Sequence, residues 1–307
     1  MTLVLFLEQT LNGLQLGIML FLMAAGLTLV FGIMHLINLA HGSLYMVGAY
    51  VTASATMASG NFAIGVAAGV LAAGAAGILV ELLALRRLYG RDHLDQVLAT
   101  FGVILTFNEL TKIVWGPHAL FMAIPDTLSG TIEVLPGVPY PAYRLFIIGV
   151  GLMVCVGLRH LIVNTRLGML IRAGATHREM VGALGVNIDR LFTWVFGIGA
   201  MLAGLAGAMA GPMLAIEVGM GESILILTFV VIIIGGIGSV RGALVGALLV
   251  GIVDTYGRAF LPLIMRSVLD PAAADSVGAS ISSVTIYLLM AMVLIWRPRG
   301  LFQAYGG

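Results

Sequence analysis

Histidine, cysteine and acidic side chains are the groups in this 307-residue sequence whose chemistry could serve catalysis, metal binding or ion coupling. The histidines are scattered along the chain, at His35, His41, His93, His118, His160 and His177. The single cysteine, Cys155, excludes an internal disulfide and a cysteine-based metal site. No stretch reads HExxH, GxSxG, CxxC or GxxxxGK[ST]. We therefore predict that the chain is not an enzyme, needs no cofactor of its own and has no P-loop for ATP.

The acidic residues within apolar stretches all lie close to the ends of those stretches, at Glu81, Glu109, Glu222 and Asp254. Carriers coupled to ions or protons usually hold ionisable groups well inside the membrane. Glu109 and Lys112 are three residues apart on one helix face, so we expect them to neutralise each other. The sequence thus predicts a pathway without an energy source, and the energy would come from a partner.

Composition identifies the elements that would position these groups. Sixty percent of the residues are hydrophobic and 9% are charged, whereas a soluble domain carries about 25% charged residues. The apolar runs are near the length at which a helix crosses a bilayer, and the alternating pattern of a membrane barrel is missing. We predict one transmembrane domain over residues 1–307, an all-α bundle of eight or nine membrane helices. The predicted spans are 11–34, 42–58, 62–85, 97–115, 144–163, 190–212, 222–240, 242–257 and 280–296.

Arginines mark one side of the predicted bundle. They concentrate in four segments that alternating spans would place together, namely 86–91, 159–190, the turn at Arg241, and the tail with Arg297 and Arg299. Positive residues are retained on the cytoplasmic side of a membrane. This predicts a cytoplasmic C-terminus and an outer segment at 116–143, with the N-terminus outside if all nine spans cross. The net charge of +1 gives no indication of a nucleic-acid partner.

Polar residues follow the first predicted span, at Asn38, His41 and Ser43 around the helix-breaking Gly42. Irregular backbone at membrane depth is tolerated only where it is buried in protein or lines a cavity. One interpretation is a discontinuous helix beside a translocation pathway. The alternative is that Asn38 and His41 form hydrogen bonds between helices or lie in a cytoplasmic turn. For Tyr45, packing is the simpler explanation.

Two further segments stand out. Residues 164–189 form the largest interior loop, where apolar residues at 180, 181 and 184 predict a short helix bounded by Gly174 and Gly185. Near the end of another span, glycines 235, 236 and 238 precede Ser239 and could permit a kink or a close approach of backbones. Small residues four apart, such as Gly65, Gly69, Ala73 and Gly77, predict close helix packing within the chain.

Three stretches resemble the permeases of high-affinity branched-chain amino-acid importers of the ATP-binding-cassette class. The first runs from Gly26 to Tyr50, the second from Thr165 to Arg190, and the third combines 235–247 with the tail 297–302. Ser43 departs from the family, where relatives often carry an acid. The resemblance implies a type II importer-like permease in the bacterial inner membrane. Its substrate would be a branched-chain amino acid or a related amide, urea or aromatic acid.

The resemblance also implies partners and site residues. The expected partners are a homologous second permease, two ATPase subunits that hold ATP and Mg, a periplasmic or lipid-anchored solute-binding protein, and membrane lipid. The expected pathway residues are Asn38, His41, Gly42, Ser43, Tyr45, Gly235, Gly236 and Ser239. The expected ATPase-coupling residues are Arg172, Thr176, Glu179, Met180, Ala183, Leu184 and Gly185. Arg258 and Arg266 are expected to receive the solute-binding protein.

Two rival functions remain open at this point: a stand-alone secondary carrier or channel, and a structural membrane subunit without a pathway.

Overall fold

The computed structural model of the chain describes residues 3–34, 36, 38–267 and 269–302. Within them the fold is a helical bundle with one small two-stranded sheet. Its α-helices are α1 (Leu3–Met34), α2 (His41–Ser59), α3 (Phe62–Leu83), α4 (His93–Trp115), α5 (Ala142–Asn164), α6 (Arg166–Thr176), α7 (Arg178–Ala183), α8 (Ile188–Ala210), α9 (Met220–Gly235), α10 (Val240–Met265) and α11 (Pro271–Trp296). The short elements are the 3-10 helices η1 (Leu85–Leu88) and η2 (Asp126–Leu128) and the strands β1 (Thr131–Leu135) and β2 (Val138–Pro141).

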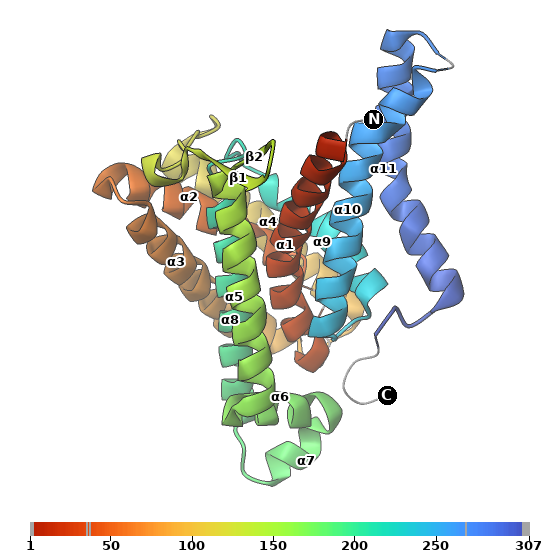
Figure 1. Cartoon of the computed structure of the whole chain (residues 1–307). Coiled ribbons are helices and arrows are strands. Elements are labelled where there is room, and N and C mark those ends of the chain that lie inside the picture. Colours follow the sequence, from red (N-terminus) through yellow and green to blue (C-terminus); the bar gives the residue numbers. More distant parts are fainter. Residues whose placement is uncertain (1–2, 35, 37, 268, 303–307) are drawn as a thin grey trace.

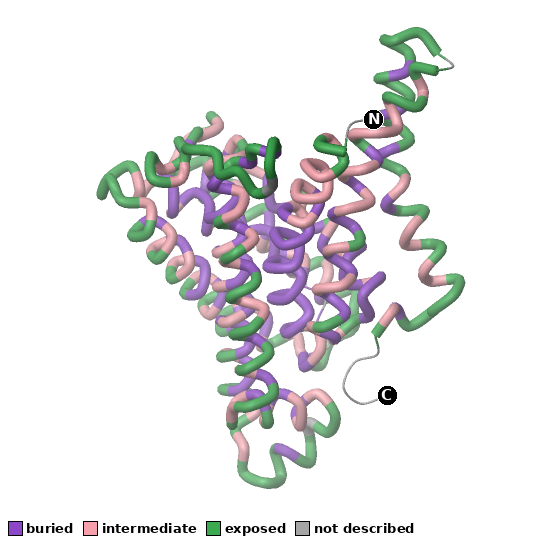
Figure 2. Tube along the Cα trace, viewed as in Figure 1, coloured by how far each residue is buried: buried purple, intermediate pink, exposed green. Residues whose placement is uncertain are grey.

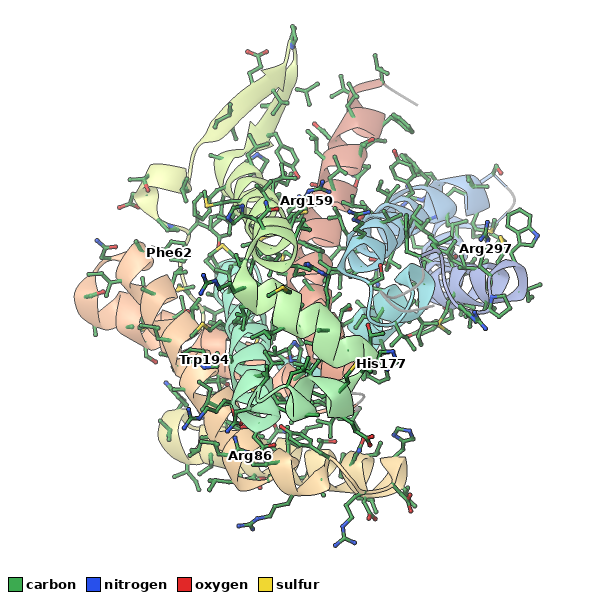
Figure 3. All side chains as sticks on the ribbon, turned by 90° about the horizontal axis from the view of Figure 1, so that it is seen from below. Phe62, Arg86, Arg159, His177, Trp194 and Arg297 are labelled. Carbon is green, nitrogen blue, oxygen red and sulfur yellow. The ribbon has the colours of Figure 1, made fainter. Side chains whose placement is uncertain are left out.

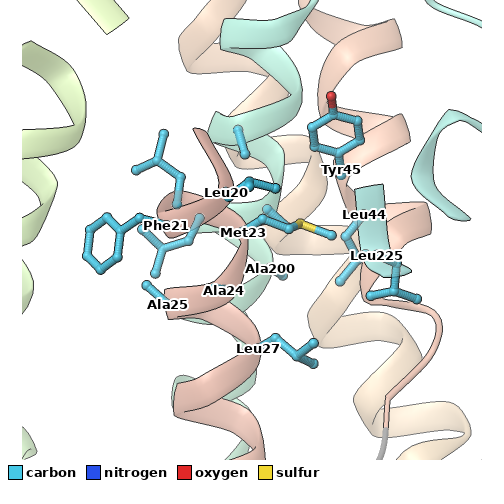
Figure 4. Close-up of a cluster of buried hydrophobic side chains, with 14 of the residues drawn as sticks. Leu20, Phe21, Met23, Ala24, Ala25, Leu27, Leu44, Tyr45, Ala200 and Leu225 are labelled. Carbon is cyan, nitrogen blue, oxygen red and sulfur yellow. The ribbon is translucent and has the colours of Figure 1, made fainter. Parts of the chain in front are cut away.

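Helix α1 forms the centre of the bundle (Figure 1). It packs against α10, α8, α5, α9 and α6, and its middle turns are buried on every side (Figure 2). Leu20, Phe21 and Met23 are completely buried there. A helix that is apolar all round is stable only where neighbours or lipid surround it. Figure 4 shows the central cluster that α1 forms with Leu44 and Leu225.

All nine predicted spans correspond to helices, and most boundaries agree within a few residues. The exceptions are α1, which begins at Leu3, α10, which continues to Met265, and α11, which begins at Pro271. Seven of the helices are long and apolar enough to cross a membrane. The other two are α2, which is less apolar, and α9, which has 16 residues. The start of α1 and the end of α11 lie at opposite ends of the bundle (Figure 1), as an odd number of passes requires.

Glycines let the inner helices approach closely, as their spacing predicted. A Cβ atom on Gly65 or Gly69 of α3 would collide with Thr56 or Thr52 of α2. One on Gly77 would collide with Ala200 of α8. The stripe of small residues on α3 therefore packs within this chain, against α2 and α8.

The two ends of the bundle differ. One end, here called the hairpin end, carries the antiparallel strands β1 and β2, which the sequence did not predict. Their turn contains Gly137, whose φ of +81° favours glycine. The opposite end, here called the loop end, carries α6 and α7 (Figure 1). Figure 3 views the bundle from the loop end, with Arg86, Arg159, His177 and Arg297 labelled on four different segments.

Candidate functional site

Helix α2 begins at His41, whose side chain is completely buried inside the bundle. The ring Nε2 of His41 lies 3.3 Å from the backbone oxygen of Met23, in the middle of α1. A carbonyl only accepts hydrogen bonds, so this contact requires the proton on Nε2 and leaves Nδ1 as an acceptor. Gly26 provides the space, because its missing Cβ would lie 3.1 Å from the ring of His41. His41 is therefore held inside the bundle, against the middle of α1.

Several polar atoms around this segment are buried without a hydrogen-bond partner among the described residues. They include both amide atoms of Asn38, Nδ1 of His41 and the hydroxyl of Thr28. Asn38 and His41 are completely buried. An unsatisfied buried polar group costs about 1–3 kcal/mol. His41 joins two helices, as the hydrogen-bonding alternative predicted, but Asn38 does not, and it remains a candidate for a polar pathway.

The other members of this group are packed. Ser43 and Tyr45 are 4% and 1% exposed, and Tyr45 borders the apolar cluster of Figure 4. Gly42 touches the backbone of Gly221 at the start of α9, where any Cβ would collide. Packing thus accounts for Gly42 and agrees with the simpler explanation of Tyr45.

The predicted glycine group between α9 and α10 is a docking point for the chain's own tail. Backbone amides of Leu301 and Phe302 donate to the carbonyls of Ile234 and Gly235 at 2.9 Å, which satisfies two free carbonyls at the end of α9. Gly236, with φ of +102°, has no room for a side chain beside Phe302. Ser239 caps α10 by accepting a bond from the amide of Gly242. Each of these contacts is structural.

The structure does not bring the two predicted pathway groups together. Gly42 of α2 packs against Gly221 at the start of α9, whereas Gly235 lies at the end of α9. At a rise of 1.5 Å per residue, about 20 Å of helix separates them. They would have to be separate points along one route and cannot form one binding site.

The interior loop folds as two helices joined at His177, not as one. Gly174 does not bound a helix, contrary to prediction, because α6 continues through it to Thr176. The reason is that Gly174 is buried against Leu191 and Ile33 inside the last turn of α6. Gly185 does end the segment, with φ of +87°.

Most of the predicted coupling residues are on the surface of the loop end. Met180 and Leu184 are 61% and 79% exposed, while Val181 between them anchors α7 in the bundle. The remaining exposed members are Thr176, Glu179, Ala183 and Gly185. Arg172 is the exception, since it is half-buried and lines a cavity against α1.

A buried polar network at the loop end was not predicted as a site. The carboxylate of Glu81 in α3 is fully buried and accepts bonds from Arg86, Tyr89 and Thr193. The Tyr89 bond is 2.6 Å long and the Thr193 bond is 2.9 Å. Burial, and then the bond to Glu81, raises the pKa of Tyr89, so its phenol stays a donor. The network joins α3, the η1 loop and α8, and its sequence signal was an acid at a span end with Arg86 five residues later.

This network borders a groove that reaches α7. Its lining includes Arg86 and Tyr89, Asp189 and Phe192 of α8, and Glu179 of α7. The groove measures about 450 Å³. Helix α7 and residues of the Glu81 network thus line the same groove.

The two arginines predicted to receive a binding protein are paired within the chain. Arg258 contacts Asp254 at 2.9 Å, and Arg266 contacts Asp275 at 2.9 Å. The carboxylate of Asp275 raises the pKa of Arg266 through this bond. Their side chains are 62% and 48% exposed, so both remain accessible at the surface.

The chain is similar to known proteins over nearly its whole length. Residues 9–295 match the family described as the permease component of branched-chain amino acid transport systems. The chain belongs to this family. It is 30% identical to the high-affinity branched-chain amino acid transport system permease protein BraD of Pseudomonas aeruginosa, over 96% of this chain and 95% of that protein. No solved structure matches it.

Two relatives from Escherichia coli carry the names of different permeases of a branched-chain amino acid transport system. LivH is 28% identical over 96% of this chain and 95% of its own length. LivM is 29% identical over 91% of this chain and 67% of its own length. The chain therefore resembles both, with greater coverage of LivH, and it is a multi-pass membrane permease component.

Proposed function

We propose that this chain is a permease subunit of an ATP-binding-cassette importer for branched-chain amino acids in the bacterial inner membrane. This proposal depends mainly on one observation, the family match over residues 9–295. The names of BraD and LivH support the substrate class, and a related amide, urea or aromatic acid is the wider range. The chain itself supplies no catalysis in this proposal, because ATP and Mg bind to the partner ATPases.

The loop end faces the cytoplasm in this proposal. Arginines of η1, α6, α8 and the tail support it, because positive residues favour the cytoplasmic side. The hairpin end then faces outward, toward a periplasmic or lipid-anchored solute-binding protein. Arg258 and Arg266 are accessible to it, but their acidic partners would have to be shared or displaced.

Helix α7 is the proposed contact with the ATPase subunit. Met180 and Leu184 are exposed apolar side chains at the loop end, which faces the cytoplasm in this proposal, so a partner protein is expected to cover them. Val181 anchors the same helix to the bundle. Closure of the ATPases would push α7 against the groove beside Glu81, and the Glu81 network would carry the movement to α3 and α8.

A homologous second permease completes the pathway in this proposal. The similarity of the chain to both LivH and LivM supports such a pair. The cavity between the two permeases would open alternately to each side as the ATPases close and separate.

Reconstitution of the chain tests the proposal. Vesicles that contain both permeases, the ATPases and the binding protein should accumulate labelled leucine only with ATP. The chain alone should transport nothing. Uptake by the chain alone, without nucleotide, would instead identify a stand-alone carrier or channel.

Crosslinking tests the contact through α7. In a Cys155→Ala background, Met180→Cys and Leu184→Cys should form crosslinks to a co-expressed ATPase, because both positions are exposed at the loop end. Thr131→Cys, in the hairpin at the opposite end, is the matched control and should form none. Equal crosslinking at Thr131, or none at either α7 position, would remove the coupling role of α7.

A further inference from the structure

A groove opens on the outside of the bundle near the loop end, between α5 and α10. Both helices pack against α1, and Figure 1 shows them on either side of it. The groove has a volume of about 300 Å³, and Phe302 of the tail also lines it. Val163 of α5 and Phe302 are 44% and 40% exposed. Because α5 and α10 are long and apolar enough to cross a membrane, the groove is accessible to lipid.

Most of the groove wall is apolar. Helix α10 contributes Leu244 and Val245, and α5 contributes Cys155, Ile162 and Val163. Lipid tails are as apolar as these side chains. An acyl chain can therefore lie along this wall without leaving any polar group of the wall unsatisfied.

Two arginines give the groove a positive charge. Arg159 lies near the end of α5 and Arg241 at the start of α10. Both are exposed, and neither forms an ion pair with another described residue. Among the described residues that line the groove, none is acidic. The charge of the two guanidinium groups is thus available to an anion from outside the chain.

Charged and apolar residues follow the same order on both helices. Helix α5 ends at the loop end and α10 begins there, so Cys155 and Val245 each lie about one helical turn deeper in the membrane than the arginine of their own helix. Long arginine side chains near helix ends extend to the level of the lipid headgroups. Figure 3 labels Arg159 in the view onto this end. The groove thus combines a cationic level near the membrane surface with an apolar wall beneath it.

We propose that this groove binds an anionic phospholipid, with its phosphate between Arg159 and Arg241 and one acyl chain along Leu244 and Val245. Guanidinium groups bind phosphate with strong, charge-assisted hydrogen bonds, and basic pockets between membrane helices bind anionic headgroups. The rest of the lipid stays in the bilayer, since the groove is open. The bound lipid connects α5, which continues into α6, with α10 and the tail.

The chemistry of the groove favours lipid over a protein partner. A second permease would have to bring acidic side chains to the level of the two arginines, and charged side chains in membrane segments are costly. A phospholipid already holds its phosphate at this level. The inference goes beyond the proposed function and depends only on the membrane location of the chain, so it does not change with the transported solute.

Native mass spectrometry of the full chain purified in detergent tests the proposal, with dioleoylphosphatidylglycerol and dioleoylphosphatidylcholine as probes. The chain should retain phosphatidylglycerol at concentrations at which phosphatidylcholine is lost. Arg159→Gln and Arg241→Gln should each lower the apparent affinity for phosphatidylglycerol about fivefold. Arg190→Gln, at an exposed arginine of α8 at the same end, is the matched control and should leave it unchanged.

A second pair of variants tests the apolar wall. Val245→Phe fills part of the groove and should weaken phosphatidylglycerol binding although both arginines remain. Val284→Phe, at a valine of α11 that is 50% exposed, is its control and should bind normally. Added phosphatidylglycerol should also raise the thermal unfolding temperature of the unaltered chain but not that of the groove variants. Without added lipid all variants should unfold at similar temperatures, because the altered side chains are at least partly exposed.

Three results would overturn the proposal. Equal retention of the two lipids, or unchanged binding in both arginine variants, would show that the arginines do not select an anionic headgroup. Competition by glycerol phosphate as strong as that by phosphatidylglycerol would identify a site for free phosphate. Loss of the lipid when the second permease is added would show that the groove is a contact between permeases.

Discussion

Helices α1 and α4 are both apolar enough to cross a membrane and have very different surroundings. In its most apolar 18-residue window, α1 is 83% buried inside the chain, whereas α4 is 17% buried. The side chains of Leu98, Phe101 and Leu105 on α4 are all at least 51% exposed. Both helices are long enough to cross a membrane. Hydrophobicity alone does not determine which helix is central, because α5, with a mean hydropathy of 2.2 against 2.4 for α1, has only 22% of its most apolar window buried.

Glycine placement accounts for the difference. In lipid, helices associate through close packing, because the lipid tails are as apolar as the side chains. Gly17 and Gly26 of α1 each bring a neighbouring backbone within 2.9 Å of where a Cβ atom would lie. Gly102 of α4 has nothing within 4 Å of that point. The inner helices are thus joined through small residues, and α4 is left to face lipid or the second permease that we propose.

The largest expected effect concerns two acidic residues, one buried in the bundle and one exposed on α4. Glu81 is fully buried in its pair with Arg86, whereas Glu109 of α4 is 66% exposed in its pair with Lys112. Removing the charge of the buried Glu81 carboxylate weakens the bonds that it accepts from Arg86, Tyr89 and Thr193, and a buried network tolerates such a loss less well than an exposed pair does. An exposed pair is worth about 0–1 kcal/mol. Glu81→Gln should therefore lower the thermal unfolding temperature in detergent sharply, and Glu109→Gln should change it little.

Transport measurements sharpen that prediction. If the Glu81 network carries movement from α7, Glu81→Gln complexes that remain folded in vesicles should hydrolyse ATP with reduced uptake per ATP. Glu109→Gln complexes should keep the unaltered ratio. Similar unfolding temperatures for the two variants would contradict the contrast between the buried and the exposed pair.

The second prediction exchanges glycine for alanine at the two helices. In Gly26→Ala the new Cβ would lie 2.5 Å from the carbonyl oxygen of Gly199, and overpacking of this kind costs about 1–3 kcal/mol. In Gly102→Ala the methyl group has open space, and alanine favours a helix by about 0.5–1 kcal/mol. Unfolding temperatures should thus move in opposite directions. A shift of the same sign in both variants would show that packing at α1 is looser than the structure indicates.

The helices of the nine predicted spans could be predicted because each contains an apolar run, although only seven of them are long and apolar enough to cross a membrane. The Glu109–Lys112 pair could also be predicted, because both residues lie on one helix, and the structure places their charged atoms 2.7 Å apart. Hydropathy alone could not predict that α1 is central while α5, which is nearly as apolar, is peripheral. That distinction depends on which backbones meet at Gly17 and Gly26, and such contacts join residues far apart in sequence.

The sites show the same division. Exposure of Met180 and Leu184 agrees with an apolar face that the sequence displayed. The inward position of Arg172 did not follow from the sequence, since it depends on how α6 folds back beneath α1. The link between Gly236 and the tail was also hidden, although both segments carried the family resemblance. The structure shows why both segments are needed: the amides of the tail satisfy the carbonyls at the end of α9, and the glycine at 236 leaves room for the tail.

The smallest expected effect is at the outer face of α4. Replacing Leu98, Phe101 or Leu105 by alanine exchanges one lipid-accessible apolar group for a smaller one, so each change in stability should stay within about 0.5 kcal/mol. Phe21→Ala in α1 is the contrasting control, because it removes a completely buried ring and should cost about 3 kcal/mol. Unfolding temperatures of the isolated chain in detergent measure both. A large loss at Leu105 would mean that this face of α4 is packed, and the contrast with α1 would fail. If stability is unchanged but the second permease no longer co-purifies, the face of α4 belongs to that subunit, because only assembly would then depend on these side chains.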